Sequence, residues 1–297
     1  AHVKIGDLDF DISIIVSYAY GEKVLENAKY GMKKLLDSKQ SIIFANNLAD
    51  EEHHRAQNNI EILKKVKVAI ENNKIVSYFQ PIIDNKTQEI VKYESLVRLI
   101  DEEDNILSPY FFLEVAKKGQ FYNQITSIVL DNSFDALLRT DKDISINLSA
   151  LDIEKEYISH KLFTLLKKYK EHAHRVVIEL LEDEAFKNFA VIKEFISNVK
   201  VMGVRIAIDD FGSGYSNFQR LNEYQPDILK IDATLIKNIK NDAFSLSTVK
   251  TMVLFAKEQK MEVIAEYVEN EDIYNILCDL GVQYSQGYYF GKPEILP

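Results

Sequence analysis

Short apolar runs alternate with longer amphipathic segments over most of the chain. From Ile75 onward, runs rich in Ile and Val predict strands, and segments such as 190–202 and 247–259 repeat apolar residues at helical spacing. The predicted strands are 75–83, 90–99, 144–148, 176–180, 205–209, 228–231, 262–265 and 283–290. Eight strands alternating with helices predict an α/β fold, the (β/α)8 TIM-type barrel. An open doubly wound sheet is the alternative, disfavoured because no Gly-rich dinucleotide fingerprint follows the first strand.

The N-terminal region repeats this alternation on a smaller scale. It predicts a strand at 10–19, a helix at 22–36 and a strand at 41–45. This strand–helix–strand unit is too small to hold a core alone, and the pattern does not decide whether its strands pair parallel or antiparallel. A helical pattern over 47–73 then leads into the barrel, and we expect a domain boundary within 47–65.

A polar residue stands at the end of nearly every predicted barrel strand. The residues are Glu94, Asn147, Glu179, Asp209 with Asp210, Lys230, Glu266 and Gln286. Their separations of 53, 32, 30, 21, 36 and 20 positions mostly approximate one strand–helix repeat. Because the carboxyl ends of barrel strands meet on one rim, where barrel active sites form, we expect these side chains to share that rim.

The chemistry of this set indicates a metal site. Five carboxylates on one rim repel one another unless cations neutralise them, and Mg²⁺ and Mn²⁺ prefer Asp, Glu, Asn and water oxygens. Two such ions clamp a phosphodiester and activate a water. The adjacent Asp209 and Asp210 suit a bridge between two ions, and Lys230 is placed to orient the water or offset phosphoryl charge. For any one of these positions considered alone, an ordinary capping or solvated turn residue is the alternative to a metal ligand.

Composition narrows the choice of ligand. With 36 Lys and Arg against 46 Asp and Glu, the formal net charge is −10, which argues against a nucleic-acid polymer as partner. A small phosphate ligand bridged by metal ions remains compatible with this charge. Cys278 is the single cysteine, so a disulfide framework is excluded and a reducing, cytoplasmic location fits. Neither a membrane-spanning run nor a signal peptide is visible.

Eight segments in order resemble the EAL-type cyclic di-GMP phosphodiesterases. They are YFQPI at 78–82, YESLVR at 93–98, INLS at 146–149, IELLE at 178–182, IDDFGSGYS at 208–216, LKID at 229–232, AEYVE at 265–269 and QGY at 286–288. The resemblance covers about residues 66–297. It implies a modified barrel whose first strand runs antiparallel to the others, two Mg²⁺ or Mn²⁺ ions, inhibition by Ca²⁺, and hydrolysis of cyclic di-GMP to linear pGpG.

The resemblance also assigns roles to individual residues. The implied metal ligands are Glu94, Asn147, Glu179, Asp209, Asp210 and Glu266. The implied catalytic set is Lys230, Glu94, Glu182, Glu266 and Gln286, with Glu182 steadying the glycine-containing loop after the Asp pair. The implied substrate contacts are Gln80, Leu96, Arg98, Asp210 and Tyr288.

Two departures from the family pattern bear on the site. Ser95 stands at the signature Ala, a change between small residues. Tyr267 stands where the family usually has Gly, directly after Glu266. Because Gly permits a left-handed backbone or a close approach, this Tyr predicts a strained or tilted Glu266.

Residues 10–46 faintly resemble the last third of a GGDEF domain, and an unrelated capping unit is the alternative. We therefore expect a partial GGDEF-like fragment at 1–46, a helical linker at 47–65 and the barrel at 66–297. No Gly-Gly-Asp/Glu-Glu-Phe segment occurs, so cyclase activity is not expected. A homodimer and an upstream sensory region are further expectations. Two other functions stay open: a receptor that binds cyclic di-GMP without cleaving it, and a partner-binding module without nucleotide.

Overall fold

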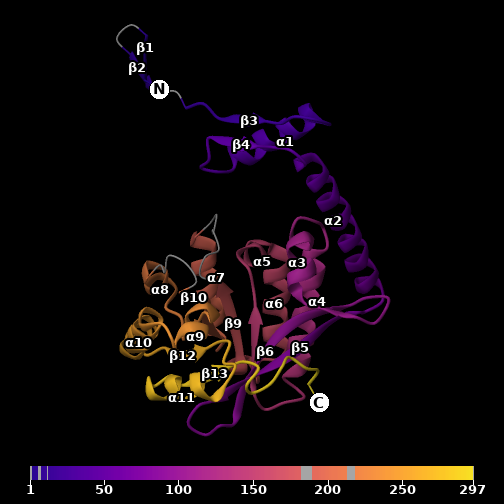
Figure 1. Cartoon of the computed structure of the whole chain (residues 1–297). Helices are drawn as coiled ribbons and strands as arrows, with labels where there is room; N and C mark the ends of the chain where they lie inside the picture. The colour runs from indigo at the N-terminus through magenta and orange to yellow at the C-terminus, as the bar shows by residue number, and fades with distance from the viewer. Residues whose placement is uncertain (1, 6–7, 12, 182–188, 213–217, 297) are drawn as a thin grey trace. The chain divides into compact units, whose positions relative to one another are not determined.

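The computed structural model describes residues 2–5, 8–11, 13–181, 189–212 and 218–296 (Figure 1). Contacts divide the chain into two compact units, residues 1–65 and 66–297. Helix α2 (Leu48–Glu71) contains the division between them. Within the described residues, no helix combines the length and the apolar character that a membrane span requires.

The N-terminal unit contains two separate two-stranded sheets. The strands β1 (His2–Ile5) and β2 (Leu8–Asp11) pair antiparallel, whereas β3 (Val16–Tyr18) and β4 (Ile42–Phe44) pair parallel around α1 (Val24–Leu36). The single strand predicted at 10–19 is therefore wrong, because this segment contributes to two different sheets. Gly31 of α1 permits a close approach to the second sheet, since a Cβ there would lie 2.1 Å from Ser17 Oγ. The assignment of this unit as a partial GGDEF-like fragment stays a prediction.

The C-terminal unit is a closed eight-stranded barrel, which confirms the predicted fold. Its strands are β5 (Ile75–Asp84), β6 (Ile90–Ile100), β8 (Asp143–Asn147), β9 (Val176–Leu181), β10 (Arg205–Phe211), β11 (Ile228–Ile231), β12 (Glu262–Ala265) and β13 (Tyr284–Gln286). The order is β5-β13-β12-β11-β10-β9-β8-β6, and pairing of β5 with β6 closes the ring. β5 runs antiparallel to both neighbours, whereas the remaining neighbours pair parallel. A short strand β7 (Ile106–Leu107) extends β6 on the outside.

Helices surround these strands (Figure 1). They are α3 (Pro109–Lys117), α4 (Tyr122–Ala136), α5 (Ala150–Glu154), α6 (Glu156–Lys168), the 3₁₀ turn η1 (Ala173–Arg175), α7 (Phe189–Val201), α8 (Phe218–Tyr224), α9 (Ala233–Asn238), α10 (Ala243–Glu258) and α11 (Glu271–Asp279). Helix α10 begins four residues before the predicted 247–259, because Asp242 caps it by accepting hydrogen bonds from the Phe244 and Ser245 amides at 3.2 and 2.9 Å.

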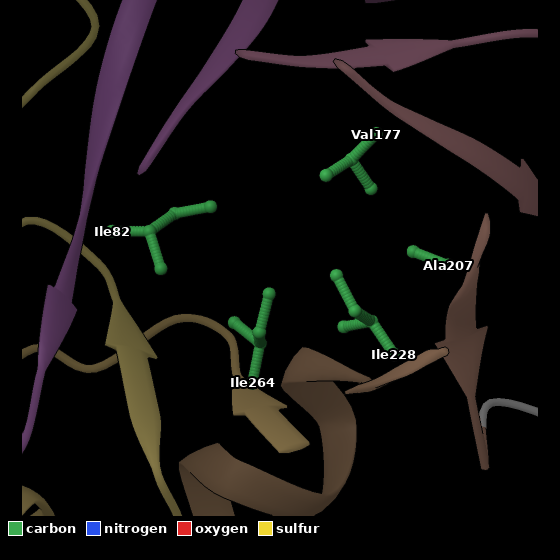
Figure 2. Close-up of a cluster of buried hydrophobic side chains, with 5 residues drawn as sticks. All are labelled: Ile82, Val177, Ala207, Ile228 and Ile264. Atoms are coloured by element: carbon green, nitrogen blue, oxygen red, sulfur yellow. The ribbon is translucent and has the colours of Figure 1, made fainter. Parts of the chain in front are cut away.

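Side chains fill the barrel interior in layers. The middle layer is apolar and completely buried, and Figure 2 shows its side chains converging from five strands: Ile82, Val177, Ala207, Ile228 and Ile264. At the amino-terminal ends of the strands, Lys92 Nζ lies 2.9 Å from Glu262 Oε2 and 3.8 Å from the centroid of the Tyr284 ring. Glu262 also pairs with Arg205 at 3.3 Å. The apolar layer therefore separates this ionic cluster from the opposite rim.

Strand β13 is shorter than predicted, and the strand expected at 283–290 is wrong beyond Gln286. The chain turns after Gln286, since the amides of Phe290 and Gly291 donate to the Gly287 carbonyl at 3.1 and 3.2 Å. Gly287 lies against the Val268 backbone, and a Cβ at this position would lie 2.1 Å from the Val268 carbonyl oxygen. The turn brings the segment after Gln286 back over the rim of the barrel.

Candidate active site

The polar residues predicted at the strand ends gather on one rim, above the apolar layer. Most of them occupy or directly follow the last residues of β8, β9, β10, β11, β12 or β13, whereas Glu94 lies midway along the longer β6. Strand register places some of them opposite one another, because Asn147 pairs with Glu179 and Gln80 pairs with Glu94. Parallel strands with their carboxyl ends aligned thus bring together residues that are distant in sequence.

Lys230 lies at the centre of the carboxylates and is completely buried. Its Nζ is 2.7 Å from Glu179 Oε2, 2.8 Å from Glu266 Oε1 and 2.9 Å from Asp209 Oδ1. Glu94 Oε2 lies farther away, at 3.7 Å. One ammonium therefore faces four carboxylates, so the cluster retains an excess of negative charge.

Two amide side chains orient Glu94. Asn147 Nδ2 donates to Glu94 Oε1 at 2.7 Å, and Gln286 Nε2 donates to Glu94 Oε2 at 2.6 Å. Gln286 Nε2 also lies 3.2 Å from Gln80 Oε1, and Gln80 Nε2 donates to the Gly291 carbonyl at 3.2 Å. The turn after β13 is thereby linked to the carboxylate cluster through amides.

The carboxylates form two groups with the spacing of metal ligands. Oxygens of Glu94, Glu179 and Asp209 lie within 4.8 Å of one another, and so do oxygens of Asp209, Asp210 and Glu266. Asp209 belongs to both groups. The buried Glu179 Oε1 has no hydrogen-bond partner among the described residues, although a buried carboxylate oxygen normally requires one. An all-oxygen donor set with this free ligand atom fits hard divalent cations.

Burial and like charge change the acidity of these groups. Burial, and then the neighbouring Glu94 and Asp209, outweigh Lys230 and raise the pKa of Glu179 to about 8. Burial followed by Asp209 raises the pKa of Asp210 to about 6, and the same causes raise the pKa of Glu266 well above its usual value. Without a cation, Glu179 therefore keeps its proton at neutral pH, whereas Asp210 loses its proton above about pH 6.

For Lys230 and Glu94, neighbouring groups shift the pKa in the direction opposite to the effect of burial. Burial lowers the pKa of Lys230, but the charges of Asp209, Glu179, Glu266 and Glu94 outweigh it and hold the pKa well above its usual value. Burial raises the pKa of Glu94, but Lys230 and the hydrogen bonds from Gln286 and Asn147 lower it overall. Lys230 is thus a permanent cation and Glu94 an anion.

A groove of about 380 Å³ opens beside the cluster. Four of the predicted substrate-contact residues line it: Gln80, Leu96, Arg98 and Tyr288. The carboxylates of Glu94 and Glu266 and the amide of Gln286 lie in its wall. Asp210, also predicted to contact substrate, is not a lining residue and lies with the second carboxylate group. A larger cavity of about 680 Å³ lies at the opposite end of the barrel, near Arg205 and Glu262, and contains none of the clustered carboxylates.

Residues 63–293 match the EAL domain family, which is most of the chain. The chain belongs to this family. The EAL domain matched here includes the complete barrel and every strand-end residue described above.

Named relatives of this EAL domain include phosphodiesterases. Cyclic di-GMP phosphodiesterase PdeF of Escherichia coli (strain K12) is 31% identical over 242 residues, which are 80% of this chain and 32% of PdeF. Cyclic di-GMP phosphodiesterase PdeB of Shewanella oneidensis is 30% identical over 241 residues, which are 78% of this chain and 28% of PdeB. The chain spans about a third of the length of these curated relatives.

Solved structures share the same arrangement. The PaMucR phosphodiesterase in complex with c-di-GMP superposes with a TM-score of 0.74 at 27% identity, covering 79% of this chain and 97% of that chain. A standalone EAL protein from Vibrio cholerae O395 in its c-di-GMP bound form gives a TM-score of 0.64 at 30% identity, covering 74% of this chain and 92% of that chain.

Tyr267 has a left-handed backbone conformation, which glycine adopts more readily than any other residue. Its φ is 58°, in the left-handed region, and Asp210 has a φ of 55°. A non-glycine residue in this region costs about 1–2 kcal/mol. Glu266 nevertheless lies 2.8 Å from Lys230, in contact with the cluster. Strained backbone therefore stands at two strand ends of the EAL domain site.

Some parts of the site were missed from the sequence, or lie outside the described residues. Glu182, predicted to steady the loop after the Asp pair, is outside them, as are residues 213–217 of that loop. Ala233, Glu269 and Pro293 line the groove and were not predicted. All three residues follow the carboxyl ends of β11, β12 and β13 in the sequence, and this position is the signal from which they could have been predicted.

Proposed function

We propose that this EAL domain is a divalent-metal-dependent phosphodiesterase that hydrolyses cyclic di-GMP to linear pGpG. The observation that carries the proposal is the pair of carboxylate groups sharing Asp209, with Lys230 between them. The groove beside them supplies room for a nucleotide. The named relatives act on this dinucleotide, which supports the choice of substrate.

The proposed metal residues fall into two sets. Glu94, Asn147, Glu179 and Asp209 would hold one ion, and Asp209, Asp210 and Glu266 the second. Mg²⁺ or Mn²⁺ would polarise the phosphodiester and lower the pKa of water, whereas Ca²⁺ is expected to bind without supporting turnover.

The chain's own residues divide the remaining work. Lys230 supplies a fixed positive charge where negative charge develops on the phosphoryl group during in-line displacement. Gln286 and Asn147 hold both oxygens of Glu94 in place. Gln80, Leu96, Arg98 and Tyr288 form the wall that positions the nucleotide. The 3′ oxygen of one nucleotide leaves when the phosphodiester is cut.

The organisation of the longer protein is also proposed. Residues 66–297 would be the catalytic domain, 47–65 a helical linker and 1–46 a GGDEF-like fragment. A homodimer and a regulatory region elsewhere in the protein are part of this proposal. The relatives' greater length is the observation that supports additional regions.

The test is incubation of the protein with cyclic di-GMP and Mg²⁺ or Mn²⁺, with chromatographic detection of pGpG. Glu94→Ala removes a proposed ligand and should abolish the product. Glu103→Ala, the same change at an exposed position, should leave the rate unchanged. Tight binding of cyclic di-GMP in Ca²⁺ without any pGpG in Mg²⁺ or Mn²⁺ would make the protein a receptor. Absence of both binding and product would leave only a partner-binding module.

A further inference from the structure

Tyr267 presents an aromatic ring to the groove at the cost of a strained backbone. Its side chain lines the groove together with Glu94, Glu266 and Arg98. Its φ of 58° is left-handed, and the residue is 40% exposed. Neither burial in a core nor backbone preference accounts for a large aromatic residue at this position. The ring is therefore a surface available to a ligand in the groove.

A lysine holds the ring from one side. Lys237 Nζ lies 3.8 Å from the centroid of the Tyr267 ring, a close cation–π contact. Lys237 belongs to α9, one helical turn after Ala233, which lines the groove. Residues four apart share a helix face, so the face that borders the groove carries this lysine. No carboxylate among the described residues pairs with Lys237.

A second exposed tyrosine with a lysine beside its ring lies in the same groove. Tyr288 is 64% exposed, and Lys292 Nζ lies 5.4 Å from the centroid of its ring. Both tyrosines line the groove, one after β12 and the other after β13. Two exposed rings, each with a lysine beside it, match a ligand that carries two aromatic bases and a negatively charged backbone.

We propose that Tyr267 is a substrate-binding residue on which one guanine of cyclic di-GMP stacks, with Lys237 holding the ring in place. This inference rests on the proposed function, because it takes cyclic di-GMP as the occupant of the groove. Every base has a π-face, and an aromatic side chain binds it by stacking. Lys237 covers one face of the ring, and the proposed guanine stacks on the other.

The experiment is calorimetric titration of the protein with cyclic di-GMP in Ca²⁺, followed by steady-state kinetics in Mg²⁺. Y267G should weaken binding about tenfold and raise KM in parallel, because the stacking surface is lost. The kcat of Y267G should stay within about twofold of the wild-type value, because stacking stabilises the bound substrate and the transition state equally. Y267F keeps the ring and should retain the wild-type affinity. K237M should weaken binding about threefold by freeing the ring.

Thermal unfolding separates this role from a structural one. Y267G removes the backbone strain of a non-glycine residue in the left-handed region, so it should not lower Tm even though it weakens binding. Lys260→Gly is the matched control, because Lys260 has a φ of 60° and lies at the end of α10, outside this groove. It should leave the affinity for cyclic di-GMP unchanged.

The outcomes are distinguishable. Equal affinity of Y267G and wild type for cyclic di-GMP overturns this inference and leaves the proposed function intact. A fall in kcat with unchanged affinity also overturns it, because Tyr267 would then act through Glu266. A wild-type protein that binds no cyclic di-GMP in Ca²⁺, Mg²⁺ or Mn²⁺ overturns the proposed function, and the inference falls with it.

Discussion

Lys230 Nζ lies 2.7 Å from Glu179 Oε2, and neither side chain is exposed to solvent. The two residues come from β11 and β9, 51 positions apart. Asp209 and Glu266 approach the same ammonium from β10 and from the end of β12. Lys230 thus neutralises only part of the negative charge of this cluster. Removing the lysine should therefore destabilise the protein, and adding a metal cation should stabilise it.

Lys230→Met is expected to reduce kcat by about 10²–10⁴-fold while cyclic di-GMP still binds in Ca²⁺. The lysine is proposed to stabilise charge in the transition state rather than to hold the nucleotide. In chelator, the variant should also lose about 3 kcal/mol of stability, because buried carboxylates lose their counter-charge. Kinetics, calorimetry and thermal unfolding measure the three effects. An unchanged kcat would contradict the proposed role of Lys230.

The metal-free protein is expected to lose stability as pH rises from about 4.5 to about 8. The pKa of Glu179 rises from 4.5 to about 8 on folding, so the folded state holds a proton that the unfolded state has released. Stability from this group is complete below about 4.5 and disappears as pH approaches 8. Tm in chelator across this range measures the effect, and Glu179→Gln should remove that part of the slope.

Metal should reverse this trend. A cation must displace the protons on Glu179 and Asp210, whose pKa values are about 8 and about 6. Mg²⁺ is therefore expected to raise Tm more near pH 8 than near pH 6. Protons should be released on binding, with calorimetry in buffers of different ionisation enthalpy as the measurement. An equal Tm increase at both pH values would show that these carboxyl groups do not hold the ion.

Asp152→Ala is expected to destabilise the protein by about 3 kcal/mol. Asp152 is buried and accepts hydrogen bonds from Tyr122 OH at 2.8 Å, Thr126 Oγ1 at 2.8 Å and Ser149 Oγ at 2.6 Å. It also completes the capping box with Ser149 at the start of α5, two residues after Asn147. Denaturant unfolding measures the loss. The exposed Asp141→Ala should cost less than about 0.5 kcal/mol.

Ile228→Ala is expected to cost about 2–5 kcal/mol, because it leaves a cavity in the apolar layer beneath the site. Ile228 is completely buried in that layer (Figure 2). Ile106→Ala is the matched change at a side chain that is 53% exposed, and it should cost far less. Equal losses in the two variants would contradict the assignment of this layer as the barrel core.

The barrel strands could be predicted because each carries a local signal. In most of them a short apolar run ends in a polar residue and is followed by a helical pattern, and all eight strands appear near their predicted positions. The single strand at 10–19 failed, because an apolar run does not reveal which sheet each half joins. The end of β13 failed for a related reason: the close approach of Gly287 to Val268 that accompanies the turn is a tertiary contact.

The direction of β5 was implied by the family resemblance and not by periodicity. A strand reads the same in either direction, and the connection determines the pairing. The link from β5 to β6 spans only residues 85–89, which permits a hairpin and excludes a helical crossover. Closure of the barrel then follows from the antiparallel pairing of β5 with β13.

The sequence by itself determined which chemical groups the site contains and that they are distributed over successive barrel strands, because strand pattern and residue type are local properties. Only the tertiary structure decided that Lys230 contacts Glu179, Asp209 and Glu266, and that Asp209 belongs to both carboxylate groups. It also decided that Tyr267 lies beside Lys237. Charge interactions, pKa values and ring contacts depend on distances of a few ångströms, and strand register and barrel closure set those distances.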